Sequence, residues 1–493
     1  MIKSNTMVID GQRRESASSE TFTVIDPHSE KAFAEVTLAD QSDVDLAAQS
    51  AARALRGAWA EFSLAERIGC IQRLRTLVAN RRDALATIST HCMGAPYRHA
   101  QWLAGALEMI DMYVEAITQI DLEYVRSDSF GHALIRRRPV GVVAGIVPWN
   151  APVRSEIKKL VPALLCGCTI VVKPAPETPL AAGILAEMCL EAGVPAGVVN
   201  AIPGSATAGE ELVMHPAIRK IAFTGSTGTG SRIATLAAPS FKRLQLELGG
   251  KSAAILLDDV DLQAAMPALV AGAWTNSGQG CFANTRVIVP RTRYREVVEA
   301  FVAAAEKQVL GDPMDPATTL GPLVSRRQWE RVISYVKKGV SEGARLLTGG
   351  GRPSHLQSGF YVAPTVFGEV DNRMMIAKEE IFGPVTAIIQ YDAVDEAIAM
   401  ANASDYGLGG SVFSSDEERA LTIARQIDTG SVAINGFGAP ASAPFGGVKC
   451  SGIGREHGPE GFDSFLEYAT YALPAAIAAR LAEAKAAVQP TVA

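Results

Sequence analysis

Short, wholly apolar segments alternate with helix-like segments in the middle of the chain, and this alternation limits the fold more than any other feature. The first apolar segment is 142–147, and helical composition follows it to about Leu165. The next, 169–172, precedes an alanine-rich helical stretch over 179–192. Strands without a polar face are buried on both faces, as in a parallel sheet covered by helices. The pattern therefore predicts an α/β fold.

The alternation occurs twice along the chain. Apolar segments at 198–202 and 220–223 extend the first set. A second set follows Gly250, with predicted strands at 252–257, 287–289, 346–348 and 385–390 and a predicted helix over 261–277. Because 493 residues are too many for one hydrophobic core, we expect two such domains.

The predicted domain limits come from where these patterns change. Residues 42–120 have helical spacing, with Ser42 to Asp45 as the expected N-terminal cap. We assign 1–121 and 140–247 to the first domain and 248–450 to the second.

A separate β segment is expected outside both domains. Residues 130–139 alternate apolar and charged side chains, as a half-exposed strand does, and 464–474 is a second candidate strand. The ranges 122–139 and 451–480 are therefore left outside the two α/β domains. The alanine-rich stretch 474–485 has helical composition, and residues 481–493 form the predicted C-terminal tail.

Composition excludes several classes of partner. The net charge of −6 disfavours nucleic acid and anionic membranes, and no apolar run approaches the length that spans a bilayer. The seven cysteines are odd in number and scattered without a CxxC pair, which disfavours both a disulfide framework and a zinc site. We expect a cytoplasmic protein without a bound metal.

Cys281 and Glu247 form the most informative pair of residues. Cys281 ends the stretch Asn-Ser-Gly-Gln-Gly-Cys, and Glu247 opens Glu-Leu-Gly-Gly-Lys. A thiol nucleophile and a carboxylate that activates water are the two groups needed to make and then hydrolyse a thioester. The ordinary alternatives are a small core cysteine and a glutamate at an exposed strand end.

Together with Pro148-Trp149-Asn150 and Phe223-Thr224-Gly225-Ser226, these motifs resemble those of the NAD(P)-dependent aldehyde dehydrogenase superfamily. The resemblance runs from about Asp26 to about Tyr468. It implies a Rossmann-like parallel-sheet cofactor domain and a second α/β catalytic domain. It further implies a β oligomerisation arm formed by 122–139 and 451–480, in a homodimer or homotetramer. It also implies oxidation of a small-molecule aldehyde to the carboxylic acid through a cysteine thiohemiacetal and thioester.

The resemblance gives each site residue a role. Cys281 is the expected nucleophile, Glu247 the base that activates water, and Asn150 the donor to the oxyanion; the alternative for Asn150 is an N-cap of the next helix. The expected cofactor-binding residues are Ile146, Trp149, Lys173, Gly225, Ser226, Leu248, Glu380 and Phe382. Lys159 matches a second lysine of the cofactor region, and Phe445 is expected to line the aldehyde pocket.

The chain departs from the family pattern beside the cofactor. The family commonly has a glutamate three positions after Lys173, where this chain has Pro176 and then Glu177. A missing carboxylate there weakens discrimination against a 2′-phosphate. NAD is the expected cofactor, and NADP is the alternative.

A second departure concerns the substrate. The family usually has an aromatic residue after Asn150 and a tryptophan later in the helix, whereas this chain carries Ala151, Arg154 and Lys158. Asn150, Arg154 and Lys158 are spaced by four and share one helix face. One hypothesis is that Arg154 or Lys158 binds a carboxylate or hydroxyl of the substrate. The alternative is that both face solvent or pair with Glu156.

Three other functions compete with this interpretation. Glu247 disfavours a CoA-acylating or phosphorylating relative, in which that carboxylate is typically absent. A cysteine esterase or amidase needs the same thiol but no dinucleotide. A structural protein that kept the fold does not need the thiol, carboxylate and amide together.

Overall fold

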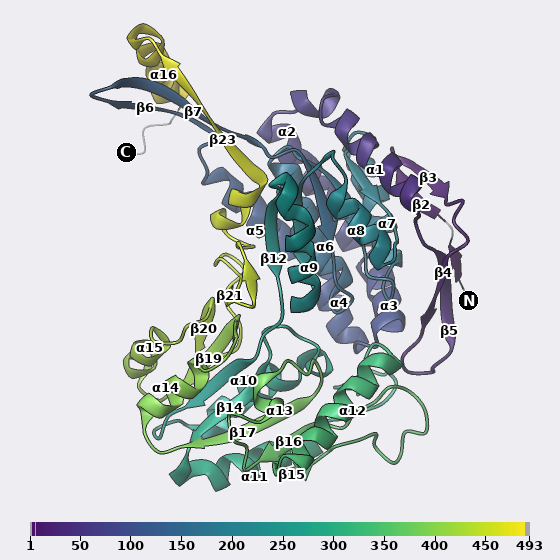
Figure 1. Cartoon of the computed structure of the whole chain (residues 1–493), viewed down its shortest axis with the longest axis vertical. Coiled ribbons are helices and arrows are strands. Elements are labelled where there is room, and N and C mark those ends of the chain that lie inside the picture. Colours follow the sequence, from purple (N-terminus) through teal and green to yellow (C-terminus); the bar gives the residue numbers. More distant parts are fainter. Residues whose placement is uncertain (1, 5, 489–493) are drawn as a thin grey trace.

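The computed structural model describes residues 2–4 and 6–488 and contains two large sheets, each with helices on both faces (Figure 1). One sheet lies in the upper part of the molecule and one in the lower part, and a β arm projects from the upper part. This arrangement confirms the predicted α/β fold with its two domains and arm. The limits assigned to the domains stay a prediction.

The first sheet has the strand order β22-β12-β11-β8-β9-β10-β2-β3. Its central strands are parallel, and β2 and β22 join its two sides in antiparallel pairing. The strands, in that order, are Gly452–Ile453, Arg243–Glu247, Ile218–Thr224, Val142–Ile146, Thr169–Lys173, Val199–Ala201, Thr6–Ile9 and Gln12–Glu15. Strand β22 belongs to this sheet although its residues fall in the range assigned to the arm.

Helices cover both faces of the first sheet because its strands are apolar on both faces. Val143 and Ile170 are buried in one core, and their neighbours Val142 and Val171 are buried in another. The first core is closed by α2 (Leu64–Asn80), α3 (Arg82–Met93), α5 (Leu107–Thr118), α6 (Pro152–Leu165) and α7 (Leu180–Glu191). The second is closed by α1 (Gln41–Ala54), α8 (Ala206–Met214) and α9 (Thr227–Ala237). Helix α4 spans Tyr97–Gly105.

The second sheet has the strand order β15-β16-β17-β14-β13-β19-β20, and it is parallel except for β15. The strands, in that order, are Arg345–Thr348, Thr365–Gly368, Val385–Tyr391, Asn284–Pro290, Ser252–Leu256, Gly409–Phe413 and Ser431–Ile434. Its helices are α10 (Leu262–Trp274), α11 (Tyr294–Glu306), α12 (Arg326–Ser341), α13 (Met375–Lys378), α14 (Val394–Asn402) and α15 (Glu417–Ala424). The predicted second alternation is therefore present.

The arm is a three-stranded antiparallel sheet in the order β23-β7-β6, and it projects at the upper left of Figure 1. Its strands are Leu466–Leu473, Gly131–Pro139 and Glu123–Asp128. Helix α16 (Ala475–Val488) follows β23, as its composition predicts, and residues 489–493 of the predicted tail lie outside the described residues. Two smaller sheets pair β1 (Ile2–Ser4), β5 (Ala32–Thr37) and β4 (Thr21–Ile25), and β18 (Tyr406–Gly407) with β21 (Val448–Lys449).

Two predicted helix boundaries are wrong. Helix α1 is capped by Asp40 instead of Ser42: the Asp40 carboxylate accepts the N–H groups of Ser42 and Asp43, and the Asp43 carboxylate accepts the N–H of Asp40. The helix predicted over 261–277 ends at Trp274, because Asn276 and Ser277 have left-handed backbones with φ of 55° each. These two residues belong to the turn that leads to Cys281.

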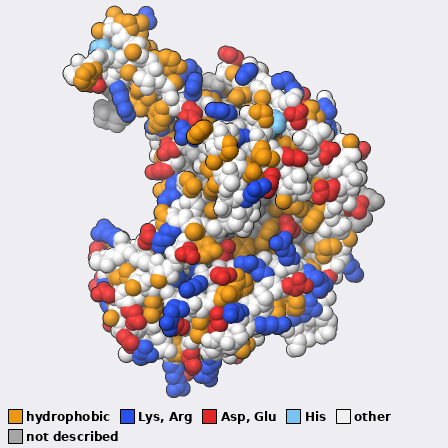
Figure 2. Space-filling view, viewed as in Figure 1, with side chains coloured by type: hydrophobic (Ala, Val, Ile, Leu, Met, Phe, Trp, Pro, Cys, Tyr) orange, Lys and Arg blue, Asp and Glu red, His pale blue; other side chains and the backbone are white. Residues whose placement is uncertain are grey.

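The edge of the first sheet at which its parallel strands end faces the edge of the second sheet at which β13 and β14 begin. The carboxyl ends of β8, β9, β11 and β12 point toward the amino ends of β13 and β14, since β12 leads into β13 through only residues 248–251. On the face drawn in Figure 2, hydrophobic side chains line a recess between the upper and lower parts. Ligands of open α/β sheets bind at the carboxyl ends of parallel strands, so this junction is where a site is expected.

None of the helices within residues 2–4 and 6–488 combines the length and apolar character that a bilayer crossing requires. All seven cysteines lie in the described part of the chain and all are free thiols.

Candidate active site

The first sheet positions most of the predicted site residues at the ends of its strands. Asn150 follows β8, Lys173 ends β9, Ser226 follows β11 and Glu247 ends β12. The second sheet contributes Cys281, which comes shortly before β14 begins. The two sets meet because the segment 248–251 is too short to separate the sheets.

The turn before Cys281 has an unusual backbone. Asn276 and Ser277 are left-handed, and Gly278 follows with φ of 70°. A Cβ at Gly278 would overlap the carbonyl of Gly383, so the turn packs against the segment that carries Phe382. Left-handed conformations cost non-glycine residues about 1–3 kcal/mol each and gather at functional sites.

Two amide side chains hold Asn150 against this turn. Asn150 Nδ2 donates to the carbonyl oxygen of Gln279 at 3.0 Å, and Asn276 Nδ2 donates to the carbonyl oxygen of Asn150 at 3.0 Å. The N-cap of α6 is Ala151, without a capping side chain, so the alternative role of Asn150 as a cap is not realised. The side-chain amide of Asn150 is therefore hydrogen-bonded to Gln279, two positions before Cys281 in the sequence.

The surroundings of the Cys281 thiol favour its protonated form. Burial raises the pKa of Cys281 to about 12; Lys158 lowers it, and the carboxyl groups of Glu380, Glu247 and Glu456 raise it. A thiol with this pKa reacts only after its proton moves to a base or after a cation stabilises the thiolate.

Glu247 is buried at 2% exposure, and its two carboxyl oxygens lack hydrogen-bond partners among the described residues. Burial raises the pKa of Glu247 well above its usual value, and Glu456 raises it further, whereas Lys159 and Lys158 lower it. A Cβ at Gly446 would lie 2.6 Å from Glu247 Oε1, so glycine there leaves room for the carboxyl group. The carboxyl group is thus buried and is not hydrogen-bonded to the backbone of the described residues.

Glu380 approaches the same region from the second domain. Its Oε1 accepts the N–H of Gly250 at 3.1 Å, and a Cβ at Gly249 would overlap its Oε2. Burial raises the pKa of Glu380 to about 7, although the hydrogen bond from Gly250 lowers it. A Cβ at Gly250 would overlap the carbonyl oxygen of Cys281. The two glycines therefore let Glu380 and Cys281 both approach the 248–251 segment closely.

The aromatic residues predicted to bind the cofactor are adjacent. The rings of Trp149 and Phe382 lie 5.3 Å apart in an edge-to-face arrangement, and Phe382 has φ of 62°. Ile146 and Leu248 are buried in the core that α9 covers, and a Cβ at Gly230 of α9 would overlap Leu248.

The turn after β11 opens to solvent at the start of a helix. Ser226 caps α9 by accepting the N–H of Thr229 at 3.3 Å, and a Cβ at Gly228 would have nothing within 4 Å. Exposed N–H groups at a helix start favour an anion such as a pyrophosphate. Gly225 packs its backbone on the ring of Phe223.

Lys173 ends β9, and its ammonium donates to the carbonyl of Gly204 at 2.7 Å. Burial lowers the pKa of Lys173 to about 8, and the Glu177 carboxylate raises it. Lys159, in contrast, is buried within the first domain as an ion pair with Glu456.

Comparison with known proteins shows the family of the chain. The family model described as "Aldehyde dehydrogenase family" matches residues 14–471. The chain belongs to the aldehyde dehydrogenase family. It is 43% identical to the geranial dehydrogenase of Castellaniella defragrans over 93% of this chain and 97% of that one. It is 41% identical to a 3-succinoylsemialdehyde-pyridine dehydrogenase of a Pseudomonas species, over 93% of this chain and 96% of that one.

Solved structures agree with the sequence comparison. The Mycobacterium tuberculosis aldehyde dehydrogenase complexed with NAD+ is 42% identical, has a TM-score of 0.94, and is matched over 96% of this chain and 99% of that chain. The predicted family, fold and enzyme class are therefore confirmed. This aldehyde dehydrogenase is an oxidoreductase that oxidises an aldehyde with a nicotinamide cofactor.

The residues predicted for the aldehyde pocket lie on α6 and in the segment after β20. Lys158 Nζ is 3.4 Å from Glu456 Oε2 and 4.8 Å from the centre of the Phe445 ring. The suggested pairing of Lys158 with Glu156 is wrong: Glu156 is buried, and its carboxyl oxygens have no partner in the described part of the chain. Arg154 is partly buried, and burial lowers its pKa while Glu108 raises it.

Sequence reasoning missed the importance of Glu456. Although burial raises its pKa, the cations of Lys159 and Lys158 lower the pKa of Glu456 to about 2. Its backbone exchanges two hydrogen bonds of 2.7 Å with Phe445. The available signal was the segment Ser-Gly-Ile-Gly-Arg-Glu over 451–456, in which two charged residues follow two closely spaced glycines.

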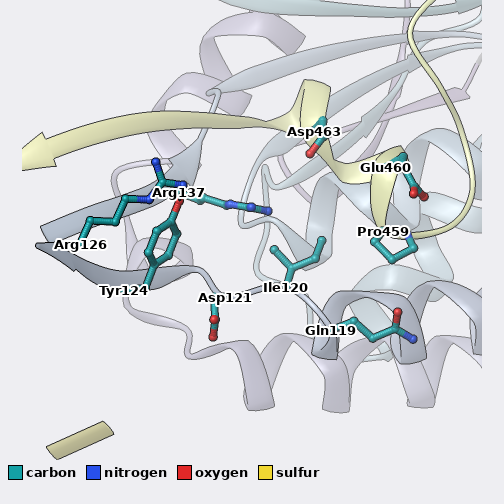
Figure 3. Close-up of a pocket in the computed structure, with 9 residues that line it drawn as sticks. All are labelled: Gln119, Ile120, Asp121, Tyr124, Arg126, Arg137, Pro459, Glu460 and Asp463. Carbon is teal, nitrogen blue, oxygen red and sulfur yellow. Dashed lines mark hydrogen bonds between the residues drawn. The ribbon is translucent and has the colours of Figure 1, made fainter. Parts of the chain in front are cut away.

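A different hollow lies at the base of the arm (Figure 3). Arg126 and Arg137 of the arm and Glu460 and Asp463 of the turn before β23 line it. None of its lining residues is among those predicted for catalysis or cofactor binding.

Proposed function

We propose that Cys281 is the nucleophile of this aldehyde dehydrogenase, that Asn150 stabilises the oxyanion and that Glu247 activates water. The observation that carries this assignment is the convergence of three groups. The Asn150 amide is held against the residues just before Cys281, and Glu247 is near enough to raise the pKa of the Cys281 thiol. Nucleophile, oxyanion donor and base are the set that acyl transfer through a thioester requires.

The chemistry follows from these positions. The Cys281 thiolate attacks the aldehyde carbon and forms a thiohemiacetal, whose oxyanion accepts N–H groups from the Asn150 side chain and the Cys281 backbone. Loss of hydride leaves a thioester on Cys281. Glu247 then takes a proton from a water molecule that attacks the thioester, which releases the carboxylic acid and the Cys281 thiolate. A donor such as Asn150 typically supplies about 3–4 kcal/mol of barrier lowering.

The residues at the carboxyl edge of the first sheet fit a nicotinamide dinucleotide. The open backbone at Gly228 and the start of α9 suit its pyrophosphate, and Lys173 is placed to donate to the ribose nearby. Glu380 and Phe382 approach from the second domain to hold the nicotinamide end. When bound, the cofactor accepts the hydride released at the thiohemiacetal carbon.

We assign NAD as the preferred cofactor. Although Pro176 occupies the position where the family commonly has a glutamate, Glu177 is near enough to raise the pKa of Lys173. A carboxylate there repels a 2′-phosphate. The NAD+ complex of the Mycobacterium tuberculosis relative supports the same assignment.

We also assign a homo-oligomer built through the arm. Phe130 at its tip is 98% exposed, and Tyr468 and Tyr471 of β23 are also exposed. Exposed aromatic side chains on a projecting sheet favour a partner surface. Sedimentation velocity should show a dimer or tetramer, and a monomer at micromolar concentration would contradict this assignment. A cytoplasmic location stays a prediction based on the scattered cysteines.

The test is reduced-nicotinamide production by the purified protein over a panel of aldehydes, with NAD and with NADP, in the absence of CoA. Cys281→Ala should abolish it, and the matched control Cys450→Ala, which removes an exposed thiol, should retain it. Turnover that requires CoA would show that Glu247 is misassigned. Ester hydrolysis without any dinucleotide-dependent oxidation would favour the esterase alternative.

A further inference from the structure

Lys158 places an ammonium group beside Phe445, the residue predicted to line the aldehyde pocket. This lysine lies on α6 one helical turn after Arg154, and its side chain is only 17% exposed. The ammonium lies over the Phe445 ring, and Phe445 in turn meets the ring of Phe282 edge to face at 5.9 Å. Because Phe282 directly follows Cys281, the Phe445 and Phe282 rings connect Lys158 with the nucleophile.

The ammonium of Lys158 can donate further hydrogen bonds. Its distance of 3.4 Å to Glu456 Oε2 is longer than the 2.7–2.9 Å of a strong charged hydrogen bond, and Glu456 already pairs with the fully buried Lys159. An aromatic ring attracts a cation but accepts no strong hydrogen bond. Lysine has three N–H donors, so Lys158 keeps donors for a ligand.

The charges around Lys158 do not cancel. Glu456 is one carboxylate facing two ammonium groups, those of Lys158 and Lys159. Burial raises the pKa of Glu247 well above the usual value, which favours the neutral form of its carboxyl group. His457, which stacks on Phe445 at 5.4 Å, adds no positive charge, because burial lowers its pKa.

Arg154 contributes a further cation one helical turn before Lys158, and the Glu108 carboxylate of α5 raises its pKa. On the cofactor side, Glu380 is partly ionised at neutral pH, since its pKa is about 7. The side of the pocket formed by α6 therefore carries net positive charge, whereas the negative charge lies toward the cofactor.

We propose that Lys158 selects aldehydes that carry a carboxylate a few carbon atoms from the aldehyde group. This inference deepens the proposed function and rests on it. The aldehyde end lies at Cys281 and Asn150, and the carboxylate of the substrate accepts hydrogen bonds from Lys158. A charged hydrogen bond of this kind gives about a 10-fold to 100-fold preference in kcat/KM over an uncharged aldehyde of similar size.

The first test needs no turnover. Iodoacetate and iodoacetamide alkylate the same thiolate: a sulfur–carbon bond forms, the carbon–iodine bond breaks, iodide leaves, and the thiol proton passes to the buffer. Their rate ratio at Cys281, measured by mass spectrometry of its peptide, reports the local charge and not the thiol pKa. We expect Lys158→Met to lower the iodoacetate-to-iodoacetamide ratio about tenfold, and Lys158→Arg to retain it.

Exposed Cys450 gives an internal reference in the same sample. Its ratio should be the same in the wild type and in both variants. An unchanged ratio at Cys281 in Lys158→Met would overturn the proposal. A change at both cysteines would also overturn it, because it would report a general change and not one in the pocket.

The second test compares kcat/KM for 4-oxobutanoate and butanal, which differ mainly in the terminal carboxylate. Wild type and Lys158→Arg should prefer 4-oxobutanoate, Lys158→Met should lose most of that preference, and Lys158→Glu should reverse it. Thermal unfolding of each variant verifies folding. Turnover of both aldehydes with a preference unaffected by Lys158→Met would overturn this inference alone. Absence of turnover would count against the proposed function, and the alkylation ratio would still decide the role of Lys158.

Discussion

Two carboxyl groups, the buried Glu247 and the half-buried Glu380, flank Cys281, and they are held in opposite ways. Glu247, at the end of β12, has no hydrogen-bond partner among residues 2–4 and 6–488, and burial raises its pKa well above the usual value. Glu380, on the segment before β17, accepts the N–H of Gly250, and its pKa is raised only to about 7. Both raise the pKa of the Cys281 thiol.

This difference suits Glu247 to proton exchange with water and Glu380 to holding a bound ligand in a fixed position. A carboxyl group without hydrogen bonds can rotate toward a water molecule and take its proton. A carboxylate bound to backbone is already oriented and suits a hydroxyl donor such as a ribose. Each group also has its own glycine, since a Cβ at Gly446 would crowd Glu247 and a Cβ at Gly249 would crowd Glu380. The contrast can be tested at each of the four residues.

The largest effect is expected for Glu247→Gln. An amide has the shape of the carboxyl group but takes no proton from water, so hydrolysis of the thioester should slow by about 10²–10⁴-fold. The first turnover should survive as a burst of reduced nicotinamide, and a mass increase equal to the acyl group should appear on the Cys281 peptide. In the wild type, steady-state turnover should fall on acidification at a pH well above 4.5, because the raised pKa of Glu247 leaves it protonated.

Glu380→Gln is the control for this experiment, because it removes the other carboxylate near the thiol. It should not accumulate the acyl-enzyme. Accumulation in Glu380→Gln without accumulation in Glu247→Gln would reverse the two assignments.

The next largest effect comes from Gly446→Ala. Its added Cβ would lie 2.6 Å from Glu247 Oε1, and Gly446 has φ of 153°, so the alanine must displace the carboxyl group or the backbone. We expect about a tenfold slower hydrolysis step, seen as a larger burst relative to steady-state turnover. Gly249→Ala is the matched variant on the other side, and it should weaken NAD binding without enlarging the burst. Equal effects of both variants on the burst would show that the two carboxyl groups do not have separate roles.

Much of this site follows from local sequence motifs. Cys281, Glu247 and Asn150 sit in short motifs whose chemistry can be interpreted residue by residue, and the alternation of strands and helices places them at facing sheet edges. The left-handed turn at Asn276 and Ser277 was not predicted, although asparagine, serine and glycine are weak helix formers. The packing of Gly278 against Gly383, more than 100 residues later, is not visible in the local sequence.

The pairing of Lys158 with Glu456 could not be predicted from the sequence either. Glu456 lies almost 300 residues from Lys159, and the intervening domain decides that they meet. From local spacing alone, Glu156 was the nearer carboxylate, and the structure leaves it buried without that partner.

A smaller effect is expected for Glu380→Gln in cofactor binding. The substituted amide would retain the hydrogen bond from Gly250 but would lose the negative charge that strengthens a bond from a ribose hydroxyl. The KM for NAD should rise about 3-fold to 10-fold, with kcat changed less. Titration of NAD by tryptophan fluorescence should give the same change in Kd. An unchanged Kd would remove Glu380 from the cofactor site.

The smallest effect concerns stability against pH. The folded pKa of Glu380 is about 7, above the value of about 4.3 for an unfolded glutamate. The folded state therefore binds this proton more tightly, and the associated stability is complete below about pH 4.3 and is lost as the pH rises through about 7. Because glutamine stays neutral, the Tm of wild type minus that of Glu380→Gln should fall by about 1–3 °C between pH 5 and pH 8. The matched control is Glu379→Gln, which removes the exposed neighbouring carboxylate. A fall equally large in the control would mean that the charge of Glu380 is not the cause.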